Sequence, residues 1–209
     1  SVRLKIELEA VKPFVSLRHL RFSSVPDLIE AMDGIIETGG LHGDRVDYLD
    51  GVVFSADESY LCVGTQTGTP GPVSDYTGSD VYYRSIQHSD GEKHDRLTIH
   101  DYLWRWDTDW FWCSGAFGVQ HPVVRRLWPR RWRRSDVYHR LVALDRRHGI
   151  VDRLDARAGR PRRERVIQDI EVPTDRLADF LEWFDARIGM RPVWLCPLRL
   201  REIDGRART

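Results

Sequence analysis

The feature that most constrains the fold is a strand–helix–strand pattern that occurs near the start of the chain and again near its end. In the first copy, alternating apolar residues at 14–22 predict a strand, and a helix follows that Ser24 caps and Gly39-Gly40 ends. Short apolar runs then predict further strands, at 46–49, 52–54 and 60–63.

The second copy has the same order of elements. It predicts a strand at 166–172, a helix that Thr174 caps and Gly189 ends, and a last strand at 193–200. Two such units with additional antiparallel strands predict an α+β fold, namely a ferredoxin-like antiparallel sheet with helices on one face. We divide the chain into a first unit, an aromatic and arginine-rich helical insertion, and a second unit, at 1–70, 71–165 and 166–209.

Both ends of the sequence predict a fragment of a longer protein. Apolar and charged residues alternate at 2–9, which indicates a strand that begins at once, without an initiator Met or a signal sequence. Residues 202–209 have the composition of a polar tail. Hydrophobic residues make up 41% of the 209, which excludes global disorder, and no run approaches the ~18 apolar residues of a transmembrane helix.

The insertion concentrates aromatic side chains. Six of the eight Trp lie between Trp104 and Trp132, and the run 100–112 mixes them with charged groups. Because buried charges are costly unless they are paired, such a mixture is typical of a pocket that binds an apolar ligand. A small satellite core with salt-bridged arginines explains the composition equally well.

The net charge of zero hides a strong asymmetry. Residues 1–120 carry 10 Lys and Arg against 19 Asp and Glu, whereas residues 121–170 carry 15 Arg against 6 acids. Within the basic part, residues 123–134 interleave Arg with Trp and aliphatic residues, which suits a membrane surface, a nucleic acid or an acid-paired face of the domain. Because the chain as a whole is neutral, we place nucleic acid last of the three.

Other signals for chemistry are weak. The three cysteines are far apart, which argues against a disulfide or a Cys-rich zinc site and favours a reducing, intracellular compartment. His88, His94 and His100 are spaced at six residues, which matches no zinc site, so no metal is predicted. The chain has neither a Walker sequence nor a G-x-S-x-G elbow.

Three stretches carry a resemblance to a known family. The strand Pro192–Leu200 with its Val-Trp-Leu-Cys-Pro motif, the run 100–112 ending in Phe-Trp, and the early Asp-Gly-Val-Val-Phe-Ser at 50–55 resemble the Δ24-sterol reductase (seladin-like) family of vanillyl-alcohol-oxidase-like flavoproteins. The similarity covers essentially the whole chain and is greatest to the bacterial branch, with an Arg-rich linker around 157–165. It implies that the chain is an incomplete cap, or substrate, domain, and that the FAD-binding domain lies upstream of it.

The resemblance also implies an activity. The expected reaction reduces a carbon–carbon double bond of a sterol- or prenyl-like lipid by hydride transfer through FAD, with NADPH as the electron donor, and this part of the protein forms the substrate pocket over the isoalloxazine ring. An isolated alkene has no carbonyl to take up negative charge, so the expected route protonates one alkene carbon. Such a site needs a general acid and benefits from aromatic faces that stabilise a cation.

The run 100–112 supplies both kinds of group. We expect Tyr102 or Asp107 to donate the proton and Arg105 to orient it or tune its charge. The predicted pocket residues are His100, Trp104, Trp106, Trp110 and Trp112, and the residues predicted to lie next to the cofactor are Trp194, Cys196 and Arg199. Strand alternation would place Tyr102, Trp104 and Trp106 on one face and Arg105 and Asp107 on the other.

Two other functions remain open. The chain could be a non-enzymatic lipid- or membrane-binding module that works through the Arg/Trp segment 123–134, or a cap that kept the fold and lost its flavin partner. The predicted partners are a lipid-like substrate and the protein's own FAD-binding domain, with peripheral membrane contact through 123–134 and no nucleic acid. The predicted location is the cytoplasm, at or near the cytoplasmic face of the membrane, and the fragment alone is expected to be inactive.

Overall fold

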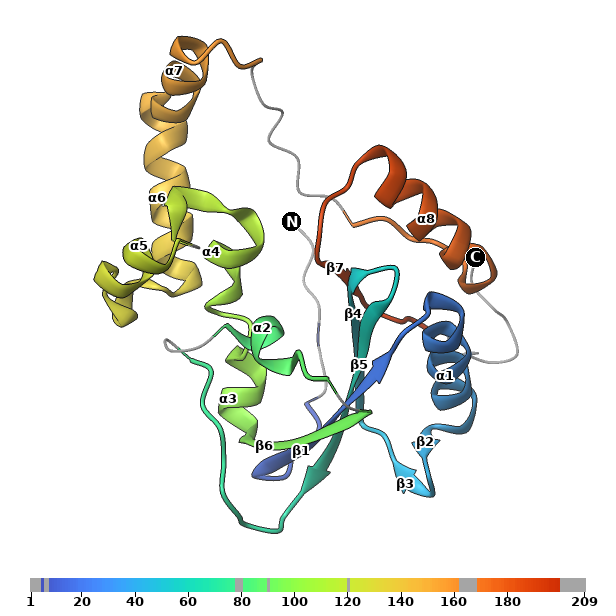
Figure 1. Cartoon of the computed structure of the whole chain (residues 1–209). Helices are drawn as coiled ribbons and strands as arrows, with labels where there is room; N and C mark the ends of the chain where they lie inside the picture. Colours follow the sequence, from blue (N-terminus) through green and yellow to red (C-terminus); the bar gives the residue numbers. More distant parts are fainter. Residues whose placement is uncertain are drawn as a thin grey trace. The chain divides into compact units, whose positions relative to one another are not determined.

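A computed structural model describes residue 5 and residues 8–77, 81–89, 91–119, 121–161 and 169–199 (Figure 1). The chain divides into two compact units. We call them the sheet unit (1–75, 86–103 and 190–209) and the helical unit (76–85 and 104–189).

The sheet unit is an α+β structure, as predicted. Its elements are β1 (Phe14–Phe22), α1 (Val25–Thr38), β2 (Gly40–Leu41), β3 (Asp44–Arg45), β4 (Tyr48–Ser55), β5 (Glu58–Thr67), β6 (Glu92–Thr98), most of α3 (Ile99–Trp104) and β7 (Val193–Leu195). The main sheet has the order β6-β1-β5-β4-β7, and every neighbouring pair in it is antiparallel. Strands β2 and β3 form a separate small hairpin.

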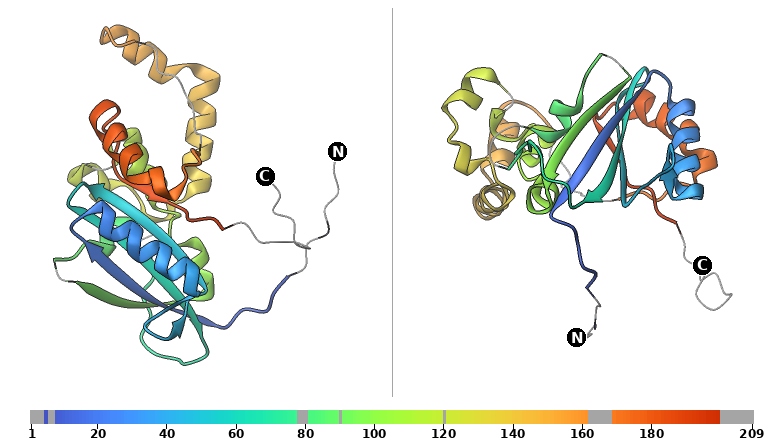
Figure 2. Two further views of the ribbon diagram at one scale, coloured as in Figure 1. Left: turned by 90° about the vertical axis from the view of Figure 1, so that its right-hand side faces the viewer. Right: turned by 90° about the horizontal axis from the view of Figure 1, so that it is seen from below.

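The predicted strand at 14–22 and its helix are confirmed. The Ser24 hydroxyl accepts the Asp27 N–H at 3.2 Å, and Gly39, at φ +67°, ends α1 in the left-handed conformation that favours glycine. Leu28, Met32 and Ile35 form the buried side of α1. The helix lies on one face of the sheet, and α3 lies on the other face, so the helices of this unit are not confined to one side (Figure 2).

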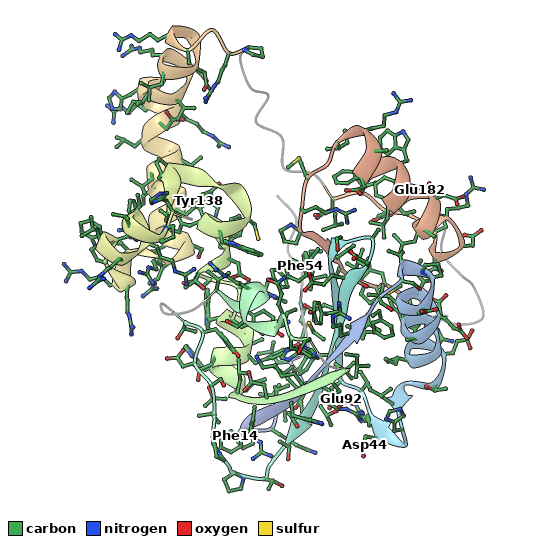
Figure 3. The ribbon with its side chains drawn as sticks, in the orientation of Figure 1. Phe14, Asp44, Phe54, Glu92, Tyr138 and Glu182 are labelled. Carbon is green, nitrogen blue, oxygen red and sulfur yellow. The ribbon has the colours of Figure 1, made fainter. Side chains whose placement is uncertain are left out.

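Ion pairs join the edge of the sheet to the small hairpin. Arg18 on β1 donates to Glu92 on β6, with Nη2 3.2 Å from Oε2, and Arg18 Nη1 lies 4.0 Å from Asp44 on β3. Glu92 and Asp44 are labelled in Figure 3. The hydrogen bond from Arg18 lowers the pKa of Glu92. Through these two contacts Arg18 links both β6 and the β2–β3 hairpin to β1.

Several predicted elements differ from the structure. The expected strands at 46–49 and 52–54 form the single strand β4, and the last strand ends at Leu195, before Pro197. Residues 169–172 form no strand, and the rest of the strand predicted at 166–172 lies outside the described residues. Of the strand predicted at 2–9, residues 5, 8 and 9 are not in a strand and the others are likewise outside the described part, as is the tail at 202–209.

The helical unit consists of short helices around a small core. They are α2 (Tyr82–Ile86, except its last residue), α4 (Asp109–Ser114), η1 (Ala116–Gly118), α5 (Pro122–Leu127), η2 (Arg130–Trp132), α6 (Ser135–His148), α7 (Ile150–Arg157), η3 (Thr174–Arg176) and α8 (Leu177–Arg187). Tyr76, Val81, Tyr82, Phe111 and Val119 are buried in it. Among the described residues no helix is long and apolar enough to cross a membrane.

Candidate functional site

The run 100–112 is helical, so the strand alternation expected for it is wrong. Helix α3 ends at Trp104, and the chain then turns, with the Asp107 N–H donating to the Trp104 carbonyl and the Asp109 N–H to the Trp106 carbonyl, both at 2.9 Å. Helix α4 begins at Asp109. Short apolar runs fit helix and strand alike, and here two helical segments and a tight turn satisfy the backbone.

The turn buries a carboxyl group that the sequence did not single out. Asp109 is only 4% exposed. Its Oδ2 accepts the Tyr83 N–H at 3.3 Å, and its Oδ1 has no hydrogen-bond partner among the described residues. Burial raises the pKa of Asp109 to about 7, although the amides of Tyr83 and Tyr82 and the charges of Arg105 and Arg125 act in the opposite direction. Asp109 therefore holds a proton at a pH where an ordinary Asp is ionised.

Arg105 lies in the same turn and is 2% exposed. Its guanidinium carbon lies 3.5 Å from the centre of the Trp106 ring and 5.2 Å from that of Tyr82. Desolvated cation–π contacts of this kind contribute up to about 2 kcal/mol. The turn thus places a buried cation and a buried acid within five residues of each other in the sequence.

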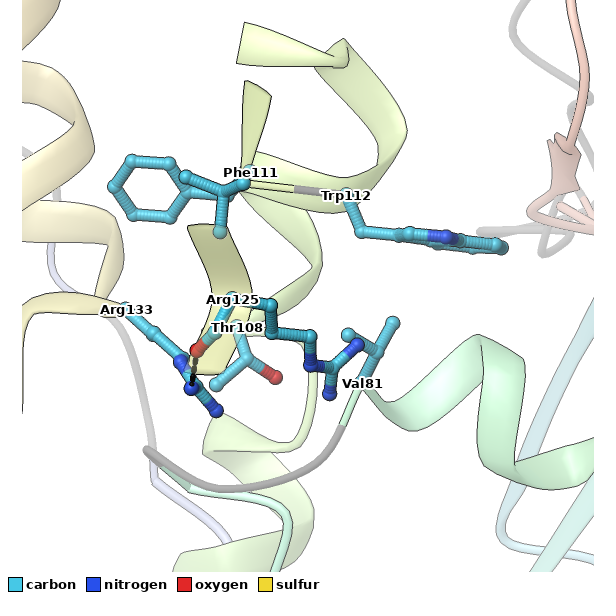
Figure 4. A pocket seen from close by; sticks show the side chains of 7 residues that line it. Val81, Thr108, Phe111, Trp112, Arg125 and Arg133 are labelled. Atoms are coloured by element: carbon cyan, nitrogen blue, oxygen red, sulfur yellow. Dashed lines mark hydrogen bonds between the residues drawn. The ribbon is translucent and has the colours of Figure 1, made fainter. Parts of the chain in front are cut away.

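A small cavity lies in the helical unit (Figure 4). Its volume is about 10 Å³, which is the space of a single water molecule and far less than a lipid needs. Its lining consists of Val81, Thr108, Phe111, Trp112, Val119, Arg125 and Arg133. Thr108 lies directly before Asp109 in the chain. Phe111 contacts Tyr138 edge to face, with ring centres 5.2 Å apart, and this packing closes one side of the core.

Asp107, predicted as a proton donor, has a different environment. Its Oδ1 accepts the Ser135 N–H at 3.1 Å, at the start of α6, and its Oδ2 lies 3.9 Å from Arg134 Nε. A carboxylate at a helix N-terminus stabilises the free amides of the first turn. This geometry gives Asp107 a structural task at α6, in addition to any chemical one.

The other residues predicted from the run 100–112 are divided between the two units and have different surroundings. Tyr102 is in the sheet unit, 5% exposed, with its ring centre 4.7 Å from that of Tyr48. His100 is exposed, and Trp104 is 53% exposed. Of the remaining aromatic residues, Trp112 lines the cavity, Trp106 stacks on Arg105, and Trp110 lies against Tyr138 and His139.

The residues predicted to lie next to a cofactor are on or after β7. Trp194 Nε1 donates to Asp50 Oδ2 at 3.4 Å, and Arg199 donates to the Ile36 carbonyl at the end of α1 at 3.0 Å. Cys196 is exposed. Trp194 thus contacts a buried acid of the neighbouring strand β4, whereas Arg199 supports α1.

Asp50 belongs to a row of polar side chains on the sheet. The register pairs His19 on β1 with Cys62 on β5 and Lys93 on β6, and pairs Cys62 with Asp50 on β4. Directly paired residues point to the same face of a sheet. His19, Cys62 and Asp50 are all at most 5% exposed. The burial of His19 could have been predicted from the sequence, because residues two apart in a strand point to the same face and Leu17 points to the buried one.

At two helix starts of the described part, an amide that could bind a phosphate group is already used by a side chain of the chain itself. A pyrophosphate group needs free amides at a glycine-rich helix start. In α1 the Ser24 hydroxyl already accepts an amide of the first turn, and in α6 the Asp107 carboxylate does so. The described residues also contain no cluster of three His, Cys, Asp or Glu side chains that could hold a metal ion.

Comparisons with known proteins give a weak similarity that covers nearly the whole chain. The Δ24-sterol reductase homologue of Caenorhabditis elegans is 19% identical over 216 aligned residues, which cover 98% of this chain and 38% of the nematode protein. The Δ24-sterol reductase of Pisum sativum is 49% identical over 35 residues, or 17% of this chain and 6% of the plant protein. This chain therefore spans well under half the length of these relatives. No family model and no solved structure matches it.

Proposed function

We propose that the chain is part of an FAD-linked oxidoreductase that resembles Δ24-sterol reductase and reduces a carbon–carbon double bond of a sterol- or prenyl-like lipid. The similarity to two such reductases supports the class of enzyme. The observation that carries the chemistry is the buried carboxyl of Asp109, which keeps its proton near neutral pH and has an oxygen without a partner among the described residues.

On this proposal Asp109 is the general acid. It donates its proton to one alkene carbon, positive charge develops on the more substituted carbon, and solvent later returns a proton to the carboxylate. The amides of Tyr82 and Tyr83 and the positive charges of Arg105 and Arg125 stabilise the carboxylate that remains. A pKa near the working pH allows both donation and recovery of the proton.

FAD supplies the hydride in this reaction, and NADPH is the proposed source of electrons. We place the binding of FAD mainly in a domain outside this chain, as the resemblance to the reductases implies; the starts of α1 and α6 are in any case capped by side chains of the chain itself. The small cavity of the helical unit holds no more than one water molecule, so on this proposal the lipid lies outside it and the proton of the buried Asp109 reaches the alkene carbon through a bound water.

The test uses the full-length protein that contains this chain, loaded with FAD and supplied with NADPH and a lipid with an isolated alkene. Asp109→Asn keeps the shape of the side chain and removes its acidity, and we expect alkene reduction to fall by about 10²–10⁴-fold. The flavin spectrum checks that FAD is still bound. Asp107→Asn and Tyr102→Phe replace the two donors expected from sequence. A loss confined to either of them would reject Asp109 as the donor.

A pure lipid-binding module is the second candidate, and the exposure of the Arg/Trp segment favours it. Leu127 is 78% and Val123 59% exposed, so two apolar side chains of this segment face solvent beside its arginines. The two candidates differ in one measurement, because a module without redox function takes up no FAD in the full-length protein. The surface itself is compatible with either function.

A further inference from the structure

We propose that the α5–η2 surface, formed by residues 122–132, docks on a membrane that contains anionic lipids. The surface presents three apolar side chains to solvent, Val123 and Leu127 on α5 and Trp132 on η2, which are 59%, 78% and 48% exposed. Val123 and Leu127 are four residues apart and share one side of the helix. This inference does not depend on the proposed reductase activity.

The structure separates the six arginines of segment 123–134 into two groups. Three of them are used inside the helical unit. Arg125 lines the cavity, Arg133 donates to the carbonyls of Arg125 and Trp128, and Arg134 pairs with Asp136 at 3.3 Å. Trp128 also belongs to the interior, with its ring centre 5.7 Å from that of Phe111. These side chains hold α5 and η2 in place.

The other three arginines are exposed. Arg126, Arg130 and Arg131 have no acidic partner among the described residues, and Arg131 lies over the ring of Trp132, 5.8 Å from its centre. No acid occurs anywhere in 122–134, so the surface is positively charged without local compensation. Charge complementarity therefore selects an anionic partner.

The apolar side chains decide which anionic partner fits. A surface that only binds phosphates of a nucleic acid gains nothing from exposed Val and Leu, whereas at a bilayer these residues enter the acyl boundary and Trp lies at the level of the headgroups. Guanidinium groups at the same depth contact lipid phosphates. Three exposed arginines without an acidic partner in the described part of the chain and three exposed apolar residues lie on one short segment, and this combination fits a lipid surface best.

The experiment is flotation of the 209-residue chain with vesicles of phosphatidylcholine alone and of phosphatidylcholine mixed with phosphatidylglycerol. We expect binding to the mixed vesicles only, and we expect salt to weaken it. R126Q/R130Q/R131Q should reduce the partition coefficient by about 100-fold, since each arginine near an anionic surface contributes roughly fivefold. The matched control R146Q/R147Q/R153Q removes three exposed charges from α6 and α7 and should reduce it much less.

The apolar contribution has its own pair of variants. V123S/L127S should lower binding to the mixed vesicles, whereas L144S/L154S, which alters two exposed leucines on α6 and α7, should not. Circular dichroism confirms that each variant is folded. Equal effects of test and control variants would overturn the proposal. So would tighter binding of a single-stranded oligonucleotide that V123S/L127S leaves unchanged, or failure of the full-length protein to bind vesicles that the chain alone binds.

Discussion

Replacing Asp109 by Asn should change how the stability of the chain depends on pH. The pKa of this carboxyl is raised from 3.8 to about 7 in the folded chain. In the unfolded chain it ionises at its ordinary pKa, so between those two values the unfolded state binds fewer protons than the folded state. The free energy of unfolding then falls as pH rises through this window and levels off above about pH 7.

The magnitude follows from the width of the window. From pH 5 to about pH 7 the folded wild-type chain keeps a proton on Asp109 that the unfolded chain has lost. Over these two pH units its free energy of unfolding falls by about 3 kcal/mol. Asn has no proton to lose. The free energy of unfolding of D109N relative to wild type should therefore rise by about 3 kcal/mol from pH 5 to pH 8. This change is expected whether D109N is more or less stable than wild type at pH 5.

Urea unfolding followed by Trp fluorescence measures this difference. Six of the eight Trp lie between Trp104 and Trp132, so the signal reports mainly on the helical unit that contains Asp109. Glu182→Gln, which changes an exposed carboxyl of the same unit, controls for the loss of one negative charge. A difference between D109N and wild type that is the same at both pH values would refute the reasoning, because Asp109 would then be ionised already at pH 5.

Three further substitutions test the local geometry. Gly64→Ala places a Cβ 3.1 Å from Tyr48 Cβ and should destabilise the sheet unit by about 1–3 kcal/mol, measured by urea unfolding; an unchanged midpoint would contradict this contact. Asp107→Ala removes the acceptor of the Ser135 amide and should lower the free energy of unfolding by about 1 kcal/mol. Hydrogen exchange at the start of α6 should become faster, and unchanged exchange would exclude a capping role. Arg105→Lys loses the planar stacking on Trp106 and should lower the free energy of unfolding by about 1 kcal/mol, measured by urea unfolding; an unchanged midpoint would contradict a role for the stack.

The parts of the fold that local signals determine were predictable from the sequence. β1 has alternating apolar residues, and α1 has a Ser24 cap and a Gly39 end, so both could be placed before any tertiary contact was known. The run 100–112 could not, because its aromatic and acidic residues satisfy helical and extended patterns alike. The length of β7 depends on its pairing with β4. Proline has no N–H to donate to such a pairing, so the prolines that flank β7 limit it, and the apolar pattern alone does not show where it ends.

The candidate site was harder to predict for a physical reason. Asp101, Asp107 and Asp109 lie in one short stretch, and nothing local distinguishes them. Only tertiary packing leaves Asp109 4% exposed while Asp107 reaches the start of α6 and Asp101 accepts from Thr98. Burial in turn raises the pKa of Asp109, so its altered acidity appears only once the helical unit is assembled.

The measurement that tests the proposed function most directly is the absorbance spectrum of the full-length protein, recorded before and after anaerobic addition of NADPH. The proposal predicts a bound flavin whose visible absorbance NADPH bleaches and whose colour a lipid with an isolated alkene restores. A folded, colourless protein that takes up no added FAD would contradict it and leave lipid binding as the better description of this chain.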